Sequence, residues 1–186
     1  MVQLQKALDA IDEANTADPT LENGQPAALL YGQRMSSELG RLYPDAPDAL
    51  KIAARGQHIE RWILPRDTYP QGRTGYHAWR RDLAKHHAER VGTIMAEAGY
   101  DSPSIEAAER MLRKEGIKRH EDVQALENVI CFVFLRYYFT AFAAKHPEEK
   151  VLGIVQKTAK KMSDDGRSWV LNEFELPEQL AAAFKS

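Results

Sequence analysis

Hydrophobic residues recur at every third or fourth position along most of the chain, which is the spacing of helices with one buried face. Leu4, Leu8 and Ile11 form the first such stripe and predict a helix over residues 2–15. Residues 121–146 are apolar nearly all round at their centre, which is typical of a buried helix. No stretch alternates with the period of two that strands show, so we predict an all-α, single-domain bundle of about seven helices.

One segment interrupts the helical pattern. Residues 64–75, LPRDTYPQGRTG, hold two prolines and two glycines and predict an irregular connection of a length that is commonly functional. We expect the helix before it to run from Asp48 to about Trp62, and the helix after it to run from Tyr76 to Gly99. The expected organisation is one domain over residues 1–186, with N-terminal helices in 1–47, a core with the candidate site in 48–162 and a C-terminal helix in 163–186. Within these regions we expect a loop at residues 18–26 and a helix over residues 27–43. We also expect a helix end before Asp164-Asp165-Gly166 and a last helix over residues 176–184.

Charge is distributed unevenly along the chain. The formal net charge of −2 over 186 residues gives no overall attraction to nucleic acid or membrane. Residues 51–90 differ, with nine Lys and Arg against four Asp and Glu. The single cysteine, Cys131, rules out a disulfide within the chain, and no stretch resembles a signal peptide or a membrane span. We therefore expect a cytoplasmic protein without a membrane partner.

The first candidate group for chemistry is ARGQHIERW, residues 54–62. In a helix, Arg55, His58 and Trp62 share one stripe, and Arg61 lies three positions after His58. A face that carries an imidazole, guanidinium groups and an indole predicts a polar pocket. The alternative is a core histidine that is hydrogen-bonded to a neighbour, with Trp62 as packing.

The second group interleaves arginines with aromatic residues in and after the 64–75 segment. Guanidinium groups suit carboxylate or phosphate, so this mixture predicts a small anionic ligand with an apolar or aromatic part. The alternative is that the arginines stack on the aromatic rings and hold the segment in place. The candidate substrate-binding residues in the whole chain are Arg55, Arg61, Arg66, Tyr69, Arg73, Tyr76, Arg80 and Lys114.

Glu127 is the most unexpected polar residue, because it interrupts an apolar helix that is predicted to be buried. A buried carboxylate needs a partner, a proton or a metal. With His58 and with His87 from the pair His86-His87, it would supply imidazole and carboxylate ligands for Fe, Mn or Zn. His58, His87 and Glu127 are therefore the candidate catalytic and metal-binding residues. A Glu–Arg pair inside the bundle is the alternative.

The motifs ARGQHIERW, PRDTYPQGRTGYHAWR, KHHAE, LENVICFVFL and KTAKKMS together resemble one family, the domain of unknown function 4202. The resemblance covers residues 49–162. Fungal members of that family are often labelled glutamyl-tRNA synthetase, and the resemblance implies a fold but no activity.

A second resemblance is to HD-domain metal-dependent phosphohydrolases. His58-Ile59-Glu60-Arg61-Trp62 is similar to their first-histidine helix, and VQALENV is similar to the helix that carries their last aspartate. No His-Asp pair lies between His58 and His87, and Glu127 stands where an aspartate would be expected. These departures suggest a degenerate HD-like pocket in which arginines have replaced metal ligands and bind an anion directly.

Three functions fit these patterns. The first is a metal-dependent enzyme, a hydrolase or an oxygenase at non-haem iron, that acts on a small anionic substrate. The second is a metal-free enzyme or small-anion-binding protein in which His58 or His87 acts as a base. The third is an RNA-associated module that stacks bases on the aromatic residues, although the pI of about 6.3 makes nucleic acid a poorer partner.

Overall fold

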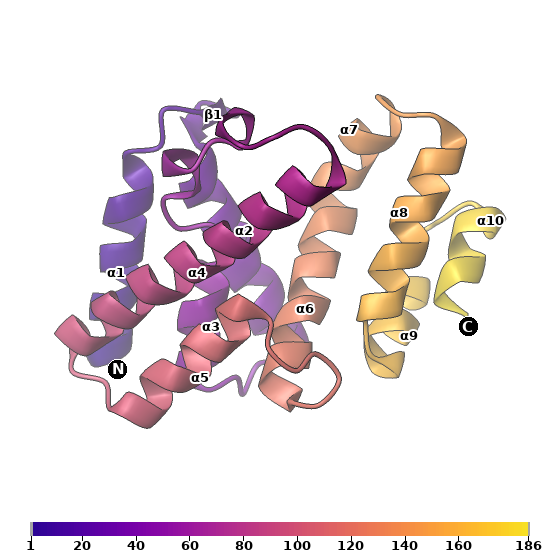
Figure 1. Cartoon of the computed structure of the whole chain (residues 1–186). Helices are drawn as coiled ribbons and strands as arrows, with labels where there is room; N and C mark the ends of the chain where they lie inside the picture. Colours follow the sequence, from indigo (N-terminus) through magenta and orange to yellow (C-terminus); the bar gives the residue numbers. More distant parts are fainter. Residues whose placement is uncertain (1, 186) are drawn as a thin grey trace. The chain divides into compact units, whose positions relative to one another are not determined.

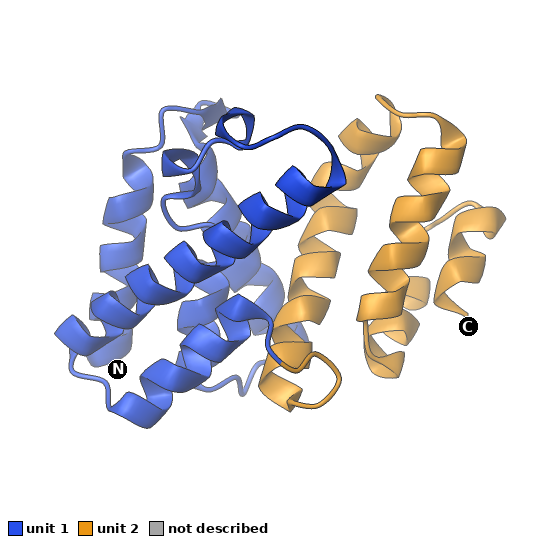
Figure 2. Cartoon of the chain, viewed as in Figure 1, with its two compact units in different colours: residues 1–115 blue, residues 116–186 orange. Residues whose placement is uncertain are grey.

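The computed structural model describes residues 2–185, whose regular secondary structure is almost entirely helical (Figure 1). Ten α-helices lie within these residues, so the all-α prediction is confirmed and the expected number of about seven is too low. The chain divides into two compact units, unit 1 over residues 1–115 and unit 2 over residues 116–186 (Figure 2). This boundary falls inside the 48–162 segment that was expected to form one core.

Unit 1 contains five helices and one short hairpin. Their bounds are α1 (Val2–Thr16), β1 (Leu21–Glu22), β2 (Gln25–Pro26), α2 (Ala27–Leu42), α3 (Asp48–Arg55), α4 (Gly72–Ala98) and α5 (Ser102–Arg113). The long helix α4 packs along α5 and against α1, while α3 lies against α2 and α5. Side chains from all five helices fill the core between them, and those that are at most 1% exposed include Ile11, Met35, Ile52, Met95 and Met111. Burial of each such side chain stabilises the fold by roughly 1.5–3 kcal/mol.

The loop predicted around residues 18–26 folds into the β1–β2 hairpin. Leu21 pairs with Pro26, and Glu22 pairs with Gln25. Asn23 and Gly24 form the turn between them with φ of 51° and 77°. Two successive positive φ angles match the right-handed twist of a hairpin, and Asn-Gly is the sequence that adopts them most easily.

The predicted helix from Asp48 to Trp62 is wrong in its second half. Helix α3 ends at Arg55, residues 56–60 form turns, and a short 3-10 helix covers Arg61–Ile63. Glu60 lies in the left-handed region with φ of 50°, where a helix cannot continue. Its backbone N–H donates to Asn15 Oδ1 at 3.0 Å, and its carboxylate accepts from Arg90 Nε at 3.1 Å. These contacts hold the turn, and periodicity alone does not reveal them.

The irregular segment predicted at residues 64–75 is shorter than expected, because α4 begins at Gly72 rather than Tyr76. A short 3-10 helix spans Arg66–Thr68. The segment then folds tightly onto the first turn of α4, where a Cβ on Gly75 would lie 1.8 Å from the carbonyl oxygen of Pro70. Glycine is therefore required at position 75 by close backbone approach.

Unit 2 contains the other helices. Their bounds are α6 (Glu121–Val133), a π-helical turn (Phe134–Tyr138), α7 (Phe139–Ala143), α8 (Glu148–Lys161), α9 (Asp164–Glu173), α10 (Glu178–Ala181) and a final 3-10 turn (Ala182–Phe184). The predicted helix over residues 121–146 is thus interrupted by a π-helical turn. Helix α9 was not predicted at all, because the Asp164-Asp165-Gly166 sequence suggested a helix end.

Residues 121–143 are apolar enough to pass a test for a membrane span, which the sequence pattern did not suggest. The 23 residues reach a mean hydropathy of 1.3 over an 18-residue window, and half of that window is buried in the protein. A buried core helix gives the same result.

Candidate functional site

The turn after α3 brings His58 against two other helices of unit 1. Gly56 makes this approach possible, since a Cβ there would lie 2.4 Å from Val91 Cγ2 on α4. The imidazole of His58 stacks on Tyr31 of α2, with ring centroids 3.7 Å apart and planes 13° from parallel. On its other side lies His87 of α4, at a centroid distance of 6.2 Å. His58 is therefore held between α2 and α4.

Helix α4 supplies one face of the site. Tyr76, Arg80, Ala84 and His87 follow one another at spacings of four, four and three residues, which places them on one side of a helix. Exposure falls along this stripe, from 46% at Tyr76 to 4% at His87. His87 rather than His86 faces the interior, while His86 Nε2 lies 3.4 Å from Glu60 Oε2.

These residues line a small cavity in unit 1. Its volume is about 10 Å³, which is close to the room that one water-sized molecule needs. Lys114 reaches the cavity from the end of α5, where it has a left-handed φ of 58°. The full lining is Gln57, His58, Arg61, Arg80, Leu83, Ala84, His87, Leu112 and Lys114.

Cationic side chains dominate the electrostatics of the cavity. Burial, followed by the nearby charges of His86, Arg61, Arg80 and Lys114, lowers the pKa of His87 to about 3. Burial likewise lowers the pKa of His58 well below its ordinary value, followed by the effects of Arg61 and His87. Both imidazoles are therefore neutral at pH 7. Burial also lowers the pKa of Arg61, to about 10, so its guanidinium stays charged.

Three buried polar atoms of the cavity lining have no hydrogen-bond partner among residues 2–185. They are Arg61 Nη1, His87 Nε2 and Gln57 Oε1. A buried polar atom without a partner costs roughly 1–3 kcal/mol, so such atoms are usually satisfied by water or a ligand. Three of them at one cavity indicate that something polar binds there.

Comparison of the chain with models of known protein families identifies the same family that the sequence motifs resemble. The model of the family described as Domain of unknown function (DUF4202) matches residues 5–183. The chain belongs to the DUF4202 family. The match extends over both compact units. A search of curated proteins and a search of solved structures each found no match.

The arginines predicted to bind substrate in this DUF4202 chain have different surroundings. Arg61, Arg80 and Lys114 line the cavity. Arg55 forms a two-pronged ion pair with Asp12, with both N–O distances at 2.6 Å. Arg66 donates from Nη1 to the carbonyl oxygens of Tyr69 and Pro70, each at 3.1 Å. Arg55 and Arg66 thus hold the fold of unit 1.

The remaining predicted binding residues lie on or near the start of α4, outside the cavity lining. Tyr69 donates its hydroxyl to Asp82 Oδ2 at 3.1 Å, and Arg73 Nε lies 3.3 Å from His77 Nε2. Tyr76 contacts Trp79, with ring centroids 5.8 Å apart. The guanidinium of Arg61 lies 4.7 Å from the centre of the Trp79 ring. Arg61 therefore stacks on an aromatic ring, as the alternative for this group of residues predicts.

Glu127 belongs to unit 2, where it is 2% exposed and lies 3.4 Å from Lys161 Nζ. It therefore has Lys161 as a cationic neighbour. Among residues 2–185, no group of three His, Cys, Asp or Glu side chains is placed to hold a metal ion. The charges around His58 and His87 also suit a metal poorly, because Arg61, Arg80 and Lys114 would repel a divalent cation.

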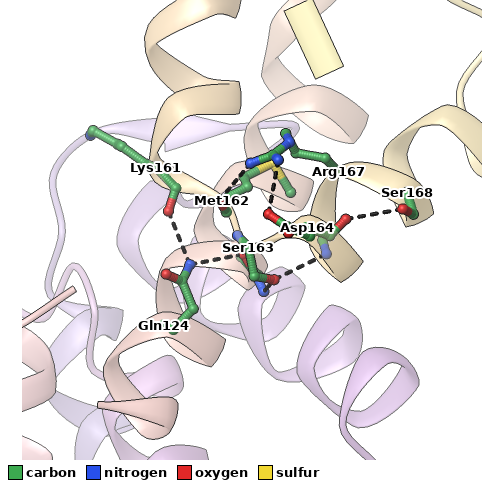
Figure 3. Close-up of polar contacts among 9 residues, drawn as sticks. Gln124, Lys161, Met162, Ser163, Asp164, Arg167 and Ser168 are labelled. Carbon is green, nitrogen blue, oxygen red and sulfur yellow. Dashed lines mark hydrogen bonds and ion pairs between the residues drawn. The ribbon is translucent and has the colours of Figure 1, made fainter. Parts of the chain in front are cut away.

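The KMS sequence at residues 161–163 has a structural role in unit 2 of this DUF4202 protein (Figure 3). The Ser163 hydroxyl accepts from the backbone N–H of Gly166 at 3.1 Å and so caps α9. Asn128, which is 1% exposed, donates to that hydroxyl at 2.8 Å and accepts from Ser163 N at 3.1 Å. Gln124 donates to the Lys161 carbonyl at 2.9 Å. Gln124 and Asn128 of α6 thus bind the end of α8 and the start of α9.

Sequence reasoning missed part of the cavity lining. Gln57 lies beside His58 in the motif that had been singled out, yet a lone glutamine gives no chemical signal. Tyr31 comes from a helix that looked purely structural, and its stacking on His58 depends on a tertiary contact. No pattern within residues 27–43 could have revealed it.

Proposed function

We propose that unit 1 binds a small oxyanion of the phosphate class directly, without a metal. The observation that carries this proposal is the meeting of unpartnered, buried Arg61 Nη1 and His87 Nε2 at one cavity, beside Arg80 and Lys114. The guanidinium donates hydrogen bonds, and an imidazole nitrogen that carries its proton does so too. An oxygen of the anion would therefore satisfy both atoms.

The charge of the lining favours an anion with more than one negative charge. Arg61, Arg80 and Lys114 contribute three positive charges, and His58 and His87 are neutral. A phosphate ester balances this charge better than a carboxylate does. Arginine adds geometry to charge, because its planar group can bind two oxygens of one phosphate.

The cavity size limits how much of the proposed anion could enter it. A volume of about 10 Å³ accommodates one oxygen atom but not a whole phosphate group. One oxygen would enter between Arg61 and His87. The phosphorus and the remaining oxygens would lie at the mouth, where the half-buried side chains of Arg80 and Lys114 are placed to contact them. A neutral His87 that carries its proton on Nε2 would donate a hydrogen bond to such an oxygen without transferring a proton.

The metal-dependent hydrolase or oxygenase is the less favoured version. It needs a divalent cation beside His58 and His87, where three cations already raise the electrostatic potential. It also needs Glu127, whose carboxylate lies beside Lys161. The same positive potential that disfavours a metal attracts an anion, so the direct form fits the charges better.

Calorimetric titration of the full chain with inorganic phosphate at low ionic strength tests the proposal. We expect one site, and we expect Arg80→Gln to weaken its affinity about tenfold or more, because a charged hydrogen bond is lost. Arg81→Gln is the matched control, since it removes the same charge from the neighbouring, 77% exposed position and should change affinity little. Absence of phosphate binding, or equal loss in both variants, would contradict the proposal, as would binding that requires added Zn²⁺ or Mn²⁺.

A further inference from the structure

Aromatic rings continue the proposed site beyond its cationic mouth. Tyr76 is 46% exposed and stands one helical turn before Arg80 on the same face of α4. Trp79 lies beside it at 5.8 Å, with the two ring planes at 54°. Ile63, which is 50% exposed, is a further large apolar side chain exposed in the preceding segment. Unit 1 thus exposes apolar side chains next to residues that line the cavity.

Arg61 joins this aromatic group to the cavity. It lines the cavity, and its guanidinium also lies 4.7 Å from the centre of the Trp79 ring. The indole N–H of Trp79 donates to the Leu64 carbonyl at 2.8 Å, which fixes the orientation of the ring under the guanidinium. Tyr76 is also close enough to Arg61 to raise the pKa of its guanidinium. One residue therefore contacts both the aromatic and the anionic parts of the site.

We infer that the ligand is a phosphate monoester whose organic part is aromatic, with its ring stacked on Tyr76. This inference rests on the proposed function, because it takes the phosphate to lie at Arg80 and Lys114. Four residues of helix separate Tyr76 from Arg80, a rise of about 6 Å. The phosphate-to-ring distance of an aryl or nucleoside monophosphate is of this order. A ligand with an alkyl group would present no π face to the exposed side of the Tyr76 ring.

Calorimetric titration with three ligands of equal charge type tests this inference on the full chain. The ligands are inorganic phosphate, cyclohexyl phosphate and phenyl phosphate. The last two have rings of similar size, and only the phenyl ring has a π face. We expect phenyl phosphate to bind roughly tenfold more tightly than cyclohexyl phosphate, because stacking on one aromatic side chain contributes that order of affinity.

Variants at Tyr76 separate stacking from general burial. Tyr76→Ser should remove the preference for phenyl phosphate and weaken the affinity for phenyl phosphate more than that for inorganic phosphate, and Tyr76→Phe should keep the preference. Tyr137→Ser is the matched control, because Tyr137 is an exposed tyrosine of unit 2. It should affect none of the three ligands.

The outcomes distinguish the two proposals. If inorganic phosphate does not bind, the proposed function fails and the inference fails with it. If phosphate binds but the phenyl and cyclohexyl esters have equal affinity, the inference is wrong and the proposed function stands. Retention of the phenyl preference in Tyr76→Ser would also overturn the inference. In a separate titration with a nucleoside monophosphate and a short single-stranded RNA, much tighter binding of the RNA would overturn it too.

Discussion

At the scale of single residues, the site depends on imidazoles that stay neutral and cations that stay charged. His87 owes its depressed pKa first to burial and then to the surrounding positive charges. A neutral imidazole inside a cationic cavity can donate or accept a hydrogen bond without adding further repulsion. This arrangement suits an anion that brings its own negative charge.

The depressed pKa of His87 predicts how stability changes with pH. The folded-state pKa of about 3 lies below the unfolded value of 6.5, so the unfolded chain binds more protons between these limits. Stability from this residue is therefore fully present above pH 6.5 and is lost as the pH falls toward 3. Urea unfolding from pH 7 to pH 4 should show a smaller loss for His87→Gln than for the wild type. An identical pH dependence in the two proteins would contradict this, and His120→Gln, at an exposed position, is the control.

Lys114 adopts a backbone conformation that favours glycine. Its φ of 58° ends α5, and a lysine in this region costs roughly 1 kcal/mol relative to glycine. The proposed function gives this side chain an anion-binding role, which would account for the tolerated strain. Lys114→Gly should therefore raise stability by up to about 1 kcal/mol in urea unfolding while it weakens phosphate binding. Lys118→Gly, at another left-handed position with φ of 70°, should raise stability without affecting phosphate binding. Unchanged phosphate affinity in Lys114→Gly would contradict a binding role.

At the scale of elements, contacts at helix ends and turns set the positions of α9 and of the turn that carries His58. Helix α9 begins because Ser163 caps it and Asn128 holds Ser163 from α6. The site itself depends on the end of α3, where Gly56 lets the turn carrying His58 meet α4. Short polar contacts and close approaches of this kind set the positions of the longer elements.

The cap of α9 predicts a measurable cost. Ser163→Ala should lower the free energy of unfolding by about 1 kcal/mol or more, because it removes the cap and leaves the buried Asn128 amide with one partner fewer. Ser168→Ala on the same helix is the matched control, since that hydroxyl only bonds its own helix at the Asp164 carbonyl. Equal effects of the two changes in urea unfolding would contradict the structural role given to the KMS sequence.

The sequence predicted elements better than it predicted their ends. Periodicity located α1, α2 and α4 to within a few residues, because a buried face leaves a regular stripe. It extended α3 through Trp62, because it cannot detect the left-handed Glu60. It missed α9, because Asp164 and Gly166 favour a turn unless Ser163 caps the chain. Of the candidate binding residues, Arg61, Arg80 and Lys114 line the cavity, whereas Arg55 is paired with Asp12, a contact between helices that no local pattern encodes.

At the scale of the whole molecule, the proposed site lies entirely within unit 1. Every residue that lines the cavity falls within residues 57–114. Unit 2 contributes its own polar network around Asn128 and the ion pair of buried Glu127 with exposed Lys161. The DUF4202 family model matches residues of both units. The proposed anion site uses residues of unit 1 alone.

This location predicts that Glu127 is not needed for anion binding. Glu127→Gln should reduce stability, because it removes the buried carboxylate that pairs with Lys161. It should leave phosphate affinity within about twofold of the wild type. A metal centre that joins Glu127 to His58 and His87 predicts the opposite, a loss of binding. Calorimetry with inorganic phosphate on the variant separates the two accounts.

The most direct test of the central claim is the dependence of phosphate affinity on Arg80 and on salt, measured by titration calorimetry of the full chain. We predict binding at one site that weakens as sodium chloride increases and falls about tenfold or more in Arg80→Gln, but not in Arg81→Gln. Phosphate that fails to bind, or that binds equally well to Arg80→Gln, would contradict the account.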